Sequence, residues 1–379
     1  MKIIFVIDNL DLSLGGGVGS FVFDLCYDLS KYTNQLYLIG IVKTNDKNDV
    51  MLNELRENGV SVFDLGINSR REALIYSFKY IRGLHKRIKQ ISKGEDTVCN
   101  LHLKLGVLYG TLATIGLKRV KCIETYHSLY SNYWIENKVL SPFIKKYIPC
   151  SNSAGEEFIK RFHPKMDKVK VIPNGVDLER IRSQTKKEKR GKRKIAISVG
   201  RFTSQKNFHV TAKAFSKIRD DDFIYKIYGQ GESEQQIIEN AGHSTHVIVC
   251  GPVSRQKILG EIANAAIVVM PSLWEGLSIF MLETIALGCP MMISNEPSLR
   301  DIFEESPLMP NETWRKCNWG YLVDTSNSTA YYDAMVNFLE NPCFAVEMRR
   351  TVKKQSEKYD IKNTTKCYMM VYQELFKDN

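Results

Sequence analysis

The chain has 379 residues and a formal net charge of +11, so it is long enough for two domains and for a well-buried core. Its first residues do not resemble a secretory signal, because Asp8 interrupts the apolar run, and the longest apolar stretch (105–117) is too short to span a membrane. The scattered cysteines form no C-x-x-C pair and favour reduced thiols, while the positive charge favours an anionic partner: a phosphorylated substrate, a membrane surface or nucleic acid.

Short β-branched runs alternate with helical patterns along almost the whole chain. Several runs are apolar without alternation, as expected for strands covered on both faces of a parallel sheet. The predicted strands are 2–8, 36–42, 60–66, 96–102, 121–127, 147–151, 169–175, 194–200, 223–229, 246–251, 266–272, 290–294 and 319–324. This alternation predicts doubly wound α/β units.

Two α/β halves flank a segment rich in Lys and Arg at 179–194. We interpret it as a solvated connection near a domain boundary, with a membrane-facing basic loop as the less favoured interpretation. The tail at 357–376 has helical apolar spacing and is predicted to pack back across a domain.

A glycine-rich turn follows the first strand. Gly15, Gly17 and Gly19 give G-x-G-x-G, with Val22 where the last glycine of a dinucleotide fingerprint should be and Lys43 where its acidic residue should be. The pattern therefore argues against a dinucleotide site. It fits a turn whose backbone amides can receive an anion or a sugar, and it fits a plain turn equally well.

Residues 68–93 carry a helical apolar stripe surrounded by Lys and Arg, with Glu72 as the only acid. An ordinary crossover helix with a basic solvent face is the favoured interpretation. Docking at an anionic bilayer is the sharper alternative.

The second half opens with a strand and a loop that contains Arg201 and Lys206, with Asn207 expected to cap the helix that follows. Two cations at a strand end suit a diphosphate. A further glycine turn, Gly229 and Gly231, ends the next strand.

The segment 270–290 combines a strand end, a loop and an apolar helix that is expected to begin near Ser278. The amides of Leu277 and Ser278 would then lie at a helix N-terminus, where a phosphate binds readily. Glu275 would lie beside them, and Glu283, inside the helix, should be paired or bound because an uncompensated buried carboxylate is costly. Two carboxylates around a phosphate-binding turn suit a nucleotide sugar.

These motifs together resemble the retaining glycosyltransferases of family 4, which have the GT-B fold. The stretches that together carry the resemblance, across both halves, are "GRFTSQKN", "IYGQGE", "WEGLSIFMLETIALGCP" and "VIPNGVD". The resemblance implies two Rossmann-like doubly wound domains that face a central cleft. It places an acceptor-side domain at 1–175, joined by a helix at about 355–379, and a nucleotide-sugar-binding domain at 176–354.

The resemblance also implies roles for single residues. Arg201 and Lys206 would neutralise the leaving diphosphate, Glu275 would contact the donor sugar and Glu283 the ribose. The further site residues that it implies are His127 near the donor sugar, Gly16, Gly17 and Gly231 near the donor, and Val253 near the base. Ser278 and Thr284 depart from the family pattern, in which Gly and Ala are usual.

The function expected from these features is metal-independent transfer of a hexose or N-acetylhexosamine, with retention, in cell-surface polysaccharide synthesis. UDP is the favoured nucleotide, with GDP as the alternative, and the acceptor is a glycan or a lipid-linked glycan. No cofactor is expected, because Arg201, Lys206 and helix-end amides can replace a metal; the formal Asp-x-Asp motif at 220–222 precedes a strand and is interpreted as a solvated turn.

We expect a cytoplasmic protein that binds no nucleic acid and contacts, at most, the inner face of an anionic membrane. Two other functions fit the same motifs. One is a GT-B-fold sugar-nucleotide epimerase, and the other is a non-catalytic nucleotide-sugar-binding subunit.

Overall fold

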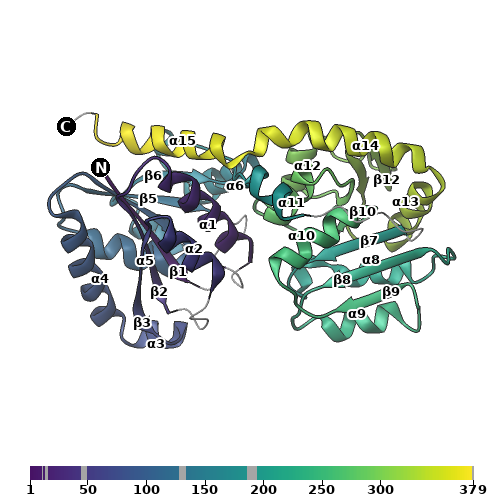
Figure 1. Ribbon diagram of the computed structural model, residues 1–379, viewed down its shortest axis with the longest axis horizontal. Coiled ribbons are helices and arrows are strands. Elements are labelled where there is room, and N and C mark those ends of the chain that lie inside the picture. The colour runs from purple at the N-terminus through teal and green to yellow at the C-terminus, as the bar shows by residue number, and fades with distance from the viewer. Residues whose placement is uncertain (11, 13–15, 44–48, 128–133, 186–193, 378–379) are drawn as a thin grey trace. The chain divides into compact units, whose positions relative to one another are not determined.

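The computed structural model describes residues 1–10, 12, 16–43, 49–127, 134–185 and 194–377. Gly15 and half of the basic connection, 186–193, lie outside the described residues. The chain forms two compact units: unit 1 comprises Met1–Gly175 with Ile361–Asn379, and unit 2 comprises Val176–Asp360. The course of the chain through each unit can be followed in Figure 1.

Unit 1 is a six-stranded parallel sheet in the order β3-β2-β1-β4-β5-β6. The strands are β1 (Lys2–Asn9), β2 (Leu36–Val42), β3 (Ser61–Ile67), β4 (Thr97–His102), β5 (Val120–Tyr126) and β6 (Ile144–Pro149). The α-helices are α1 (Gly16–Ser30), α2 (Val50–Glu57), α3 (Arg70–Ile75), α4 (Ser77–Ser92), α5 (Leu103–Thr114), α6 (Asn152–Phe162) and α15 (Ile361–Glu374). Short π and 3-10 turns lie at Ile135–Val139 and Met166–Lys168.

Helix α15 belongs to unit 1 although it ends the chain. Tyr368 and Tyr372 are fully buried. The Asn100 amide of β4 donates to the Tyr372 hydroxyl at 2.9 Å, and the hydroxyls of Thr125 in β5 and Tyr368 lie 3.1 Å apart. Because a buried polar group needs a partner, these bonds specify how α15 seats on the sheet.

Unit 2 is a seven-stranded sheet in the order β12-β13-β11-β10-β7-β8-β9, in which only β12 is antiparallel to its neighbour. The strands are β7 (Lys194–Val199), β8 (Phe223–Tyr228), β9 (Val247–Cys250), β10 (Ile267–Met270), β11 (Met291–Ser294), β12 (Trp314–Cys317) and β13 (Gly320–Val323). The α-helices are α7 (Leu178–Gln184), α8 (Phe208–Phe215), α9 (Glu234–Ala241), α10 (Arg255–Asn264), α11 (Ile279–Ala286), α12 (Pro297–Phe303), α13 (Ser328–Glu340) and α14 (Pro342–Gln355). Short 3-10 turns lie at Ser204–Lys206 and Ser356–Tyr359.

Twelve of the thirteen predicted strands are confirmed within a few residues, and both sheets are dominated by parallel pairs. The strand predicted at 169–175 is wrong. Val169 forms a single parallel bridge to Tyr147, and the segment then leaves the sheet near Pro173, which has no amide hydrogen to donate.

Strand β12 was not predicted. Its sequence, WRKC, is short and half charged, and it lies at the edge of the sheet, where one side of the strand meets solvent. No helix among the described residues is long and apolar enough to cross a membrane.

Candidate active site

The loops with the predicted site residues gather at one edge of the unit 2 sheet. Strands β10, β7, β8 and β9 are parallel neighbours, so the loops that follow them leave from the same edge. These loops are 200–207, 229–233, 251–254 and 271–278. Ligands of open α/β sheets bind at this carboxyl edge.

Lys206 and Glu275 form an ion pair within this group of loops. The Lys206 ammonium lies 2.5 Å from Glu275 Oε1, and the Ser272 hydroxyl donates to the same oxygen at 2.7 Å. Both charged side chains are largely buried. Because both contacts are made to Oε1, and an ammonium carries three donors, the pair retains capacity for hydroxyl and phosphate oxygens.

The loop that carries Lys206 is tied directly to the loop that carries Glu275. The Gln205 amide donates to the Trp274 carbonyl at 2.8 Å, and the Asn207 amide donates to the carbonyls of Pro271 and Thr325 at 3.1 and 2.9 Å. Asn207 is the N-cap residue of α8, as expected, but its backbone is left-handed, at φ 55°, and its side chain makes no capping bond. It instead joins three strand-end loops.

Arg201 comes from the same loop and is exposed. Its position is set by the glycine turn after β8. Gly231 has φ +153° and lies so close to Phe202 that an added Cβ would be 2.4 Å from the Phe202 carbonyl oxygen. Gly231 is therefore required for the packing of the Arg201 loop, whether or not it also contacts a ligand.

Glu283 is buried in α11 and is paired, as its position in the sequence predicts. The Arg255 guanidinium donates through Nε to Glu283 Oε1 at 2.6 Å, and both side chains are largely buried. Arg255 begins α10, directly after the loop with Val253, whose side chain is exposed. The ion pair thus links the ribose-binding candidate Glu283 to the start of α10, two residues after the base-binding candidate Val253.

Helix α11 begins at Ile279, next to the predicted start, and Ser278 is its N-cap. The Ser278 hydroxyl accepts from the Met281 amide at 3.4 Å. Leu277 and Ser278 are buried, so their backbone rather than their side chains would meet a ligand. The serine that replaces the usual family glycine thus has a local structural role.

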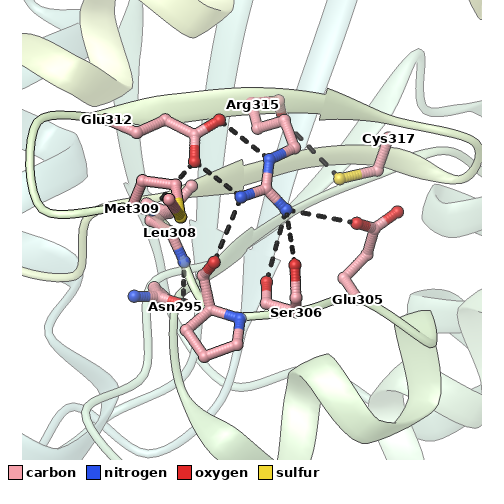
Figure 2. Close-up of polar contacts among 9 residues, drawn as sticks. Asn295, Glu305, Ser306, Leu308, Met309, Glu312, Arg315 and Cys317 are labelled. Carbon is pink, nitrogen blue, oxygen red and sulfur yellow. Dashed lines mark hydrogen bonds and ion pairs between the residues drawn. The ribbon is translucent and has the colours of Figure 1, made fainter.

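A loop after α12 lies at the same edge and is held by one arginine, as Figure 2 shows. Arg315, in β12, donates to Glu312 at 2.8 and 2.6 Å and to the carbonyls of Ser306 and Pro307 at 3.3 and 3.1 Å. The Leu308 amide donates to Asn295 Oδ1 at 3.3 Å, which joins the loop to the end of β11. We call this group, residues 305–312 with Arg315, the arginine clasp.

The acidic residues at 220–222 lie at the opposite edge. They precede β8, and Asp220 accepts from the Lys194 ammonium at 2.9 Å at the start of β7. Their interpretation as a turn away from the strand ends is confirmed. Among the described residues, no group of three His, Cys, Asp or Glu side chains is arranged to hold a metal ion.

In unit 1, Gly16 and Gly17 begin α1 after the carboxyl end of β1. Both are exposed. Gly16 has φ +72°, with open space around an added Cβ. A side chain at Gly16 would therefore strain the backbone, whereas Gly17 lies within the helix and offers a cleaner place to test bulk.

His127 follows β5 and forms a pair with His102, the last residue of the neighbouring strand β4. Nδ1 of His102 and Nε2 of His127 are 2.9 Å apart, and the rings are stacked. Phe5 stacks on His102, and Phe21 lies edge-on to His127. Burial lowers the pKa of His127 to about 3 and also lowers that of His102, so both rings are neutral near pH 7.

Sequence reasoning missed three of these polar residues: Arg255, Ser272 and His102 as the partner of His127. A signal existed for His102, because it ends a predicted strand on the same edge as His127. Arg255 and Ser272 are recognisable only when the loops are placed side by side.

Two family models match the chain and together span residues 15–359. "Glycosyl transferases group 1" matches residues 179–359, and "Glycosyltransferase Family 4" matches residues 15–180. Among curated proteins, the chain is 26% identical over 317 residues to an Escherichia coli UDP-Gal:alpha-D-GlcNAc-diphosphoundecaprenol alpha-1,3-galactosyltransferase, covering 76% of this chain and 78% of that one. A Campylobacter jejuni N-acetylgalactosamine-N,N'-diacetylbacillosaminyl-diphospho-undecaprenol 4-alpha-N-acetylgalactosaminyltransferase is 21% identical and covers 62% of each chain.

Solved structures show the same fold. HepE of Anabaena, in complex with UDP and glucose, superposes with a TM-score of 0.78 at 14% identity, covering 98% of this chain and 99% of that one. A Rickettsia africae glycosyltransferase gives a TM-score of 0.77 at 17% identity, covering 100% and 99%. The expected fold is thereby confirmed, and the chain is a glycosyltransferase of group 1 and family 4, with the two Rossmann-like sheets of the GT-B fold.

Proposed function

We propose that this enzyme transfers a hexose or N-acetylhexosamine from a nucleotide sugar, UDP in preference to GDP, to a glycan or a lipid-linked glycan of the cell surface. The transfer proceeds with retention of configuration and without a metal ion. The observation that carries the proposal is the Lys206–Glu275 pair at the carboxyl edge of the unit 2 sheet, next to Arg201.

The cations of loop 200–207 suit the departing diphosphate. Glycosyl transfer passes through an oxocarbenium-like transition state, in which negative charge builds on the leaving group. Lys206 uses one donor on Glu275 and has two more for phosphate oxygens, and the exposed guanidinium of Arg201 offers a planar, bidentate contact. Fixed cations of this kind stabilise developing charge without rearrangement during the reaction.

Glu275 and Glu283 suit the hydroxyl groups on either side of that diphosphate. Glu275 is fixed by Lys206 and Ser272 and would accept from the donor sugar. Glu283 is fixed by Arg255 and would accept from the ribose, with the base near Val253. His127 is neutral, so it would act on the sugar as a hydrogen-bonding partner rather than as a cation.

The donor and acceptor classes are supported by the relatives. The Escherichia coli protein is named for a UDP-sugar donor, and both curated relatives above are named for diphosphoundecaprenol-linked acceptors. A lipid-linked acceptor would bring the enzyme to an anionic membrane surface, at its inner face.

Replacement of Lys206 tests the proposal. We expect Lys206→Ala to lower kcat by roughly a hundredfold to a thousandfold, the usual effect of removing one such charge contact. Glu275→Gln should be similarly impaired. Lys213→Ala, on the exposed side of α8, is the matched control and should keep full activity.

The assay would first screen UDP- and GDP-sugars by thermal stabilisation and then follow transfer to an undecaprenyl-diphosphate-linked sugar, with the unfolding temperature as a check on folding. Full activity in either site variant would exclude the assigned roles. Hydrolysis or epimerisation of the donor without any transfer would favour the epimerase instead.

Metal independence is tested separately. Transfer should persist in EDTA, because Arg201 and Lys206 supply the positive charge. Complete loss in EDTA with recovery on adding manganese would overturn this part of the proposal. Anomeric configuration of the product, read by NMR, decides whether the configuration is retained.

A further inference from the structure

The corner between α3 and α4 exposes an unusual group of apolar side chains. Ile75, Tyr76 and Phe78 are 63%, 55% and 77% exposed, within four consecutive positions. Of the apolar stripe expected at 68–93, Leu84, Ile88 and Ile91 are buried against the rest of unit 1, whereas Phe78, near its start, is exposed. The apolar residues at the start of α4 are therefore not part of the core, and they form a separate surface that we call the corner patch.

The corner patch is held in a fixed shape. The Tyr80 hydroxyl donates to Glu72 Oε1 at 2.6 Å, which joins α4 to α3. The Asn68 amide and side chain donate to the other Glu72 oxygen at 3.0 and 2.9 Å, and Ser69 caps α3 by accepting from the Glu72 amide. An exposed apolar group that is rigid before binding loses less entropy when it is covered.

These hydrogen bonds also engage Glu72, the only acidic residue of the segment 68–93. The hydrogen bonds from Tyr80 and Asn68 lower the pKa of Glu72, so its carboxylate stays ionised. Both of its oxygens accept hydrogen bonds from these two residues. Glu72 thus stabilises the turn between α3 and α4.

A row of cations continues from the patch along α4. Phe78, Arg82, Lys86 and Lys89 are spaced four, four and three residues apart, so they share one helix face, and all four are exposed. This face is opposite to Leu84, Ile88 and Ile91. Helix α4 is also held against α5, because His85 Nδ1 lies 2.8 Å from the Ala113 carbonyl oxygen of α5.

An aromatic tip followed by a row of Lys and Arg is complementary to an anionic bilayer. Apolar and aromatic side chains enter the boundary between headgroups and acyl chains, while Lys and Arg on the same face meet the lipid phosphates. A protein partner would have to bury the same row of cations against carboxylates, and a second copy of this chain would bring like charges together. Charge complementarity therefore favours a lipid surface.

The position in the fold agrees with this. Helix α3 follows the carboxyl end of β3, and it is labelled at the foot of that strand in Figure 1. All strands of unit 1 are parallel, so the corner patch lies at the same edge of the unit 1 sheet as Gly16 and His127.

We propose that the corner patch and the cation row of α4 form the surface by which the enzyme docks on an anionic lipid bilayer. Ile75, Tyr76 and Phe78 enter the interface, and Arg82, Lys86 and Lys89 contact lipid phosphates. The inference rests on the proposed function only in that a lipid-linked acceptor gives docking its purpose.

Co-sedimentation of the full chain with vesicles tests the surface. The vesicles are pure phosphatidylcholine, or equal parts of phosphatidylcholine and phosphatidylglycerol. We expect binding to the anionic vesicles only, weakened at high salt because exposed charges are screened. Ile75→Ser with Phe78→Ser should reduce binding at least tenfold at every salt concentration, and Arg82→Glu with Lys86→Glu should reduce it and flatten the salt dependence.

Two controls are matched for residue type and exposure. Val346→Ser removes an exposed apolar side chain from α14, and Lys366→Glu reverses an exposed charge on α15. Both should bind like the wild type, and all variants should keep its unfolding temperature. Absence of wild-type binding to anionic vesicles, or equal binding by the corner-patch variant, would overturn the proposal.

Two further measurements separate this inference from its alternatives. Transfer to a water-soluble acceptor analogue should be unchanged in the corner-patch variant, while transfer to a lipid-linked acceptor in vesicles should fall. Vesicle binding without any transfer would contradict the proposed function and leave docking supported. A dimer that dissociates in Phe78→Ser, in a protein that ignores vesicles, would assign the patch to self-association instead.

Discussion

The histidine pair of unit 1 is kept neutral by what surrounds it. His102 and His127 hydrogen bond to each other inside a box closed by Phe5 and Phe21. A neutral pair has one hydrogen between the two facing nitrogens, so the tautomer of one ring decides the tautomer of the other. The tautomer of His102 thus determines whether Nδ1 of His127, the nitrogen outside the pair, is a hydrogen-bond donor or an acceptor.

This pair predicts a specific dependence of stability on pH. The pKa of His127 is about 3 in the folded protein and ordinarily 6.5, so the unfolded chain binds more protons between these values. The free energy of unfolding should therefore fall as pH decreases from about 6.5 toward about 3, by up to a tenfold change in the folding constant per pH unit for each histidine.

Urea unfolding at a series of pH values measures this slope. A variant with His102→Gln and His127→Gln should show a shallower slope in the same window. Identical slopes would mean that the two rings are not held neutral. The same shift predicts that His127 contributes no inflection to the pH profile of transfer near neutrality.

Replacement of Arg255 tests whether the Arg255–Glu283 ion pair contributes to stability, to donor binding or to both. Arg255→Ala would leave Glu283 buried without its partner, and this should cost about 3 kcal/mol of stability. It should also raise KM for the donor by roughly tenfold or more, because Glu283 would lose its fixed orientation.

Arg255→Lys is the companion variant, since it keeps the charge but not the planar geometry. We expect it to recover most of the stability and only part of the donor affinity. Steady-state kinetics at varied donor concentration measures KM for the donor, and chemical denaturation measures the free energy of unfolding, so the two effects are separated. Unchanged KM in Arg255→Ala would show that the pair is purely structural.

At the scale of elements, the arginine clasp shows how a strand can hold a loop that sequence alone does not reveal. The loop after α12 has no regular structure, yet one guanidinium in β12 binds two carbonyls and two carboxylates within it (Figure 2). The bidentate contact of Arg315 lowers the pKa of Glu312 to about 2. The loop is thereby fixed beside the site edge.

The clasp predicts a pH-dependent contribution to stability. Because the pKa of Glu312 is depressed, its contribution is present above the ordinary value of about 4.5 and is lost as pH falls toward about 2. Glu312→Gln should lower the unfolding temperature slightly at pH 7, and the difference from wild type should narrow below about pH 4.5. Glu340→Gln, an exposed acid on α13, should show no such pattern.

The elements themselves were largely predictable, because most strands are continuous apolar runs bounded by glycine or polar residues. The failures have physical reasons. Strand β12 is polar and lies at an edge, where burial does not select apolar residues, and the 169–175 run is apolar because it lies along β6, although Pro173 ends its pairing.

The site divides in the same way. Arg201, Lys206 and Glu275 could be proposed from the sequence because they lie in loops that follow predicted strands, and Glu283 because an acid inside an apolar helix needs a partner. The partners that orient them come from loops distant in the sequence: Ser272, Arg255 and the Asn207 contacts depend on strand order. Bilayer docking of 68–93 was considered from the sequence, but the corner patch itself was not singled out, because helical periodicity does not report which apolar side chains the rest of the fold leaves uncovered.

At the scale of the whole molecule, the two units differ in whether they are formed by one continuous stretch of the sequence or by two. Unit 2 is continuous, whereas unit 1 needs α15 from the end of the chain. Tyr372 is fully buried there and accepts from Asn100. Tyr372→Ala should therefore destabilise unit 1 by about 3–5 kcal/mol, as large aromatic deletions do, and leave unit 2 unaffected.

Hydrogen exchange read by peptide resolves the two units. Faster exchange is expected in β4 and β5, with β7 and β10 unchanged. Tyr331→Ala, at an equally buried tyrosine of α13, is the reciprocal control and should affect unit 2 alone. Equal acceleration in both units for either variant would show that they unfold together.

The late supply of α15 also matters during synthesis. The ribosome releases all of unit 2 before the residues that close unit 1, so the first sheet to be made is the last to be completed. Until then the face that receives Tyr368 and Tyr372 is uncovered, and a nascent chain stalled before Ile361 would present it to chaperones and proteases. A frameshift between the codons of unit 2 and those of α15 would thus damage unit 1, most of which has already been synthesised.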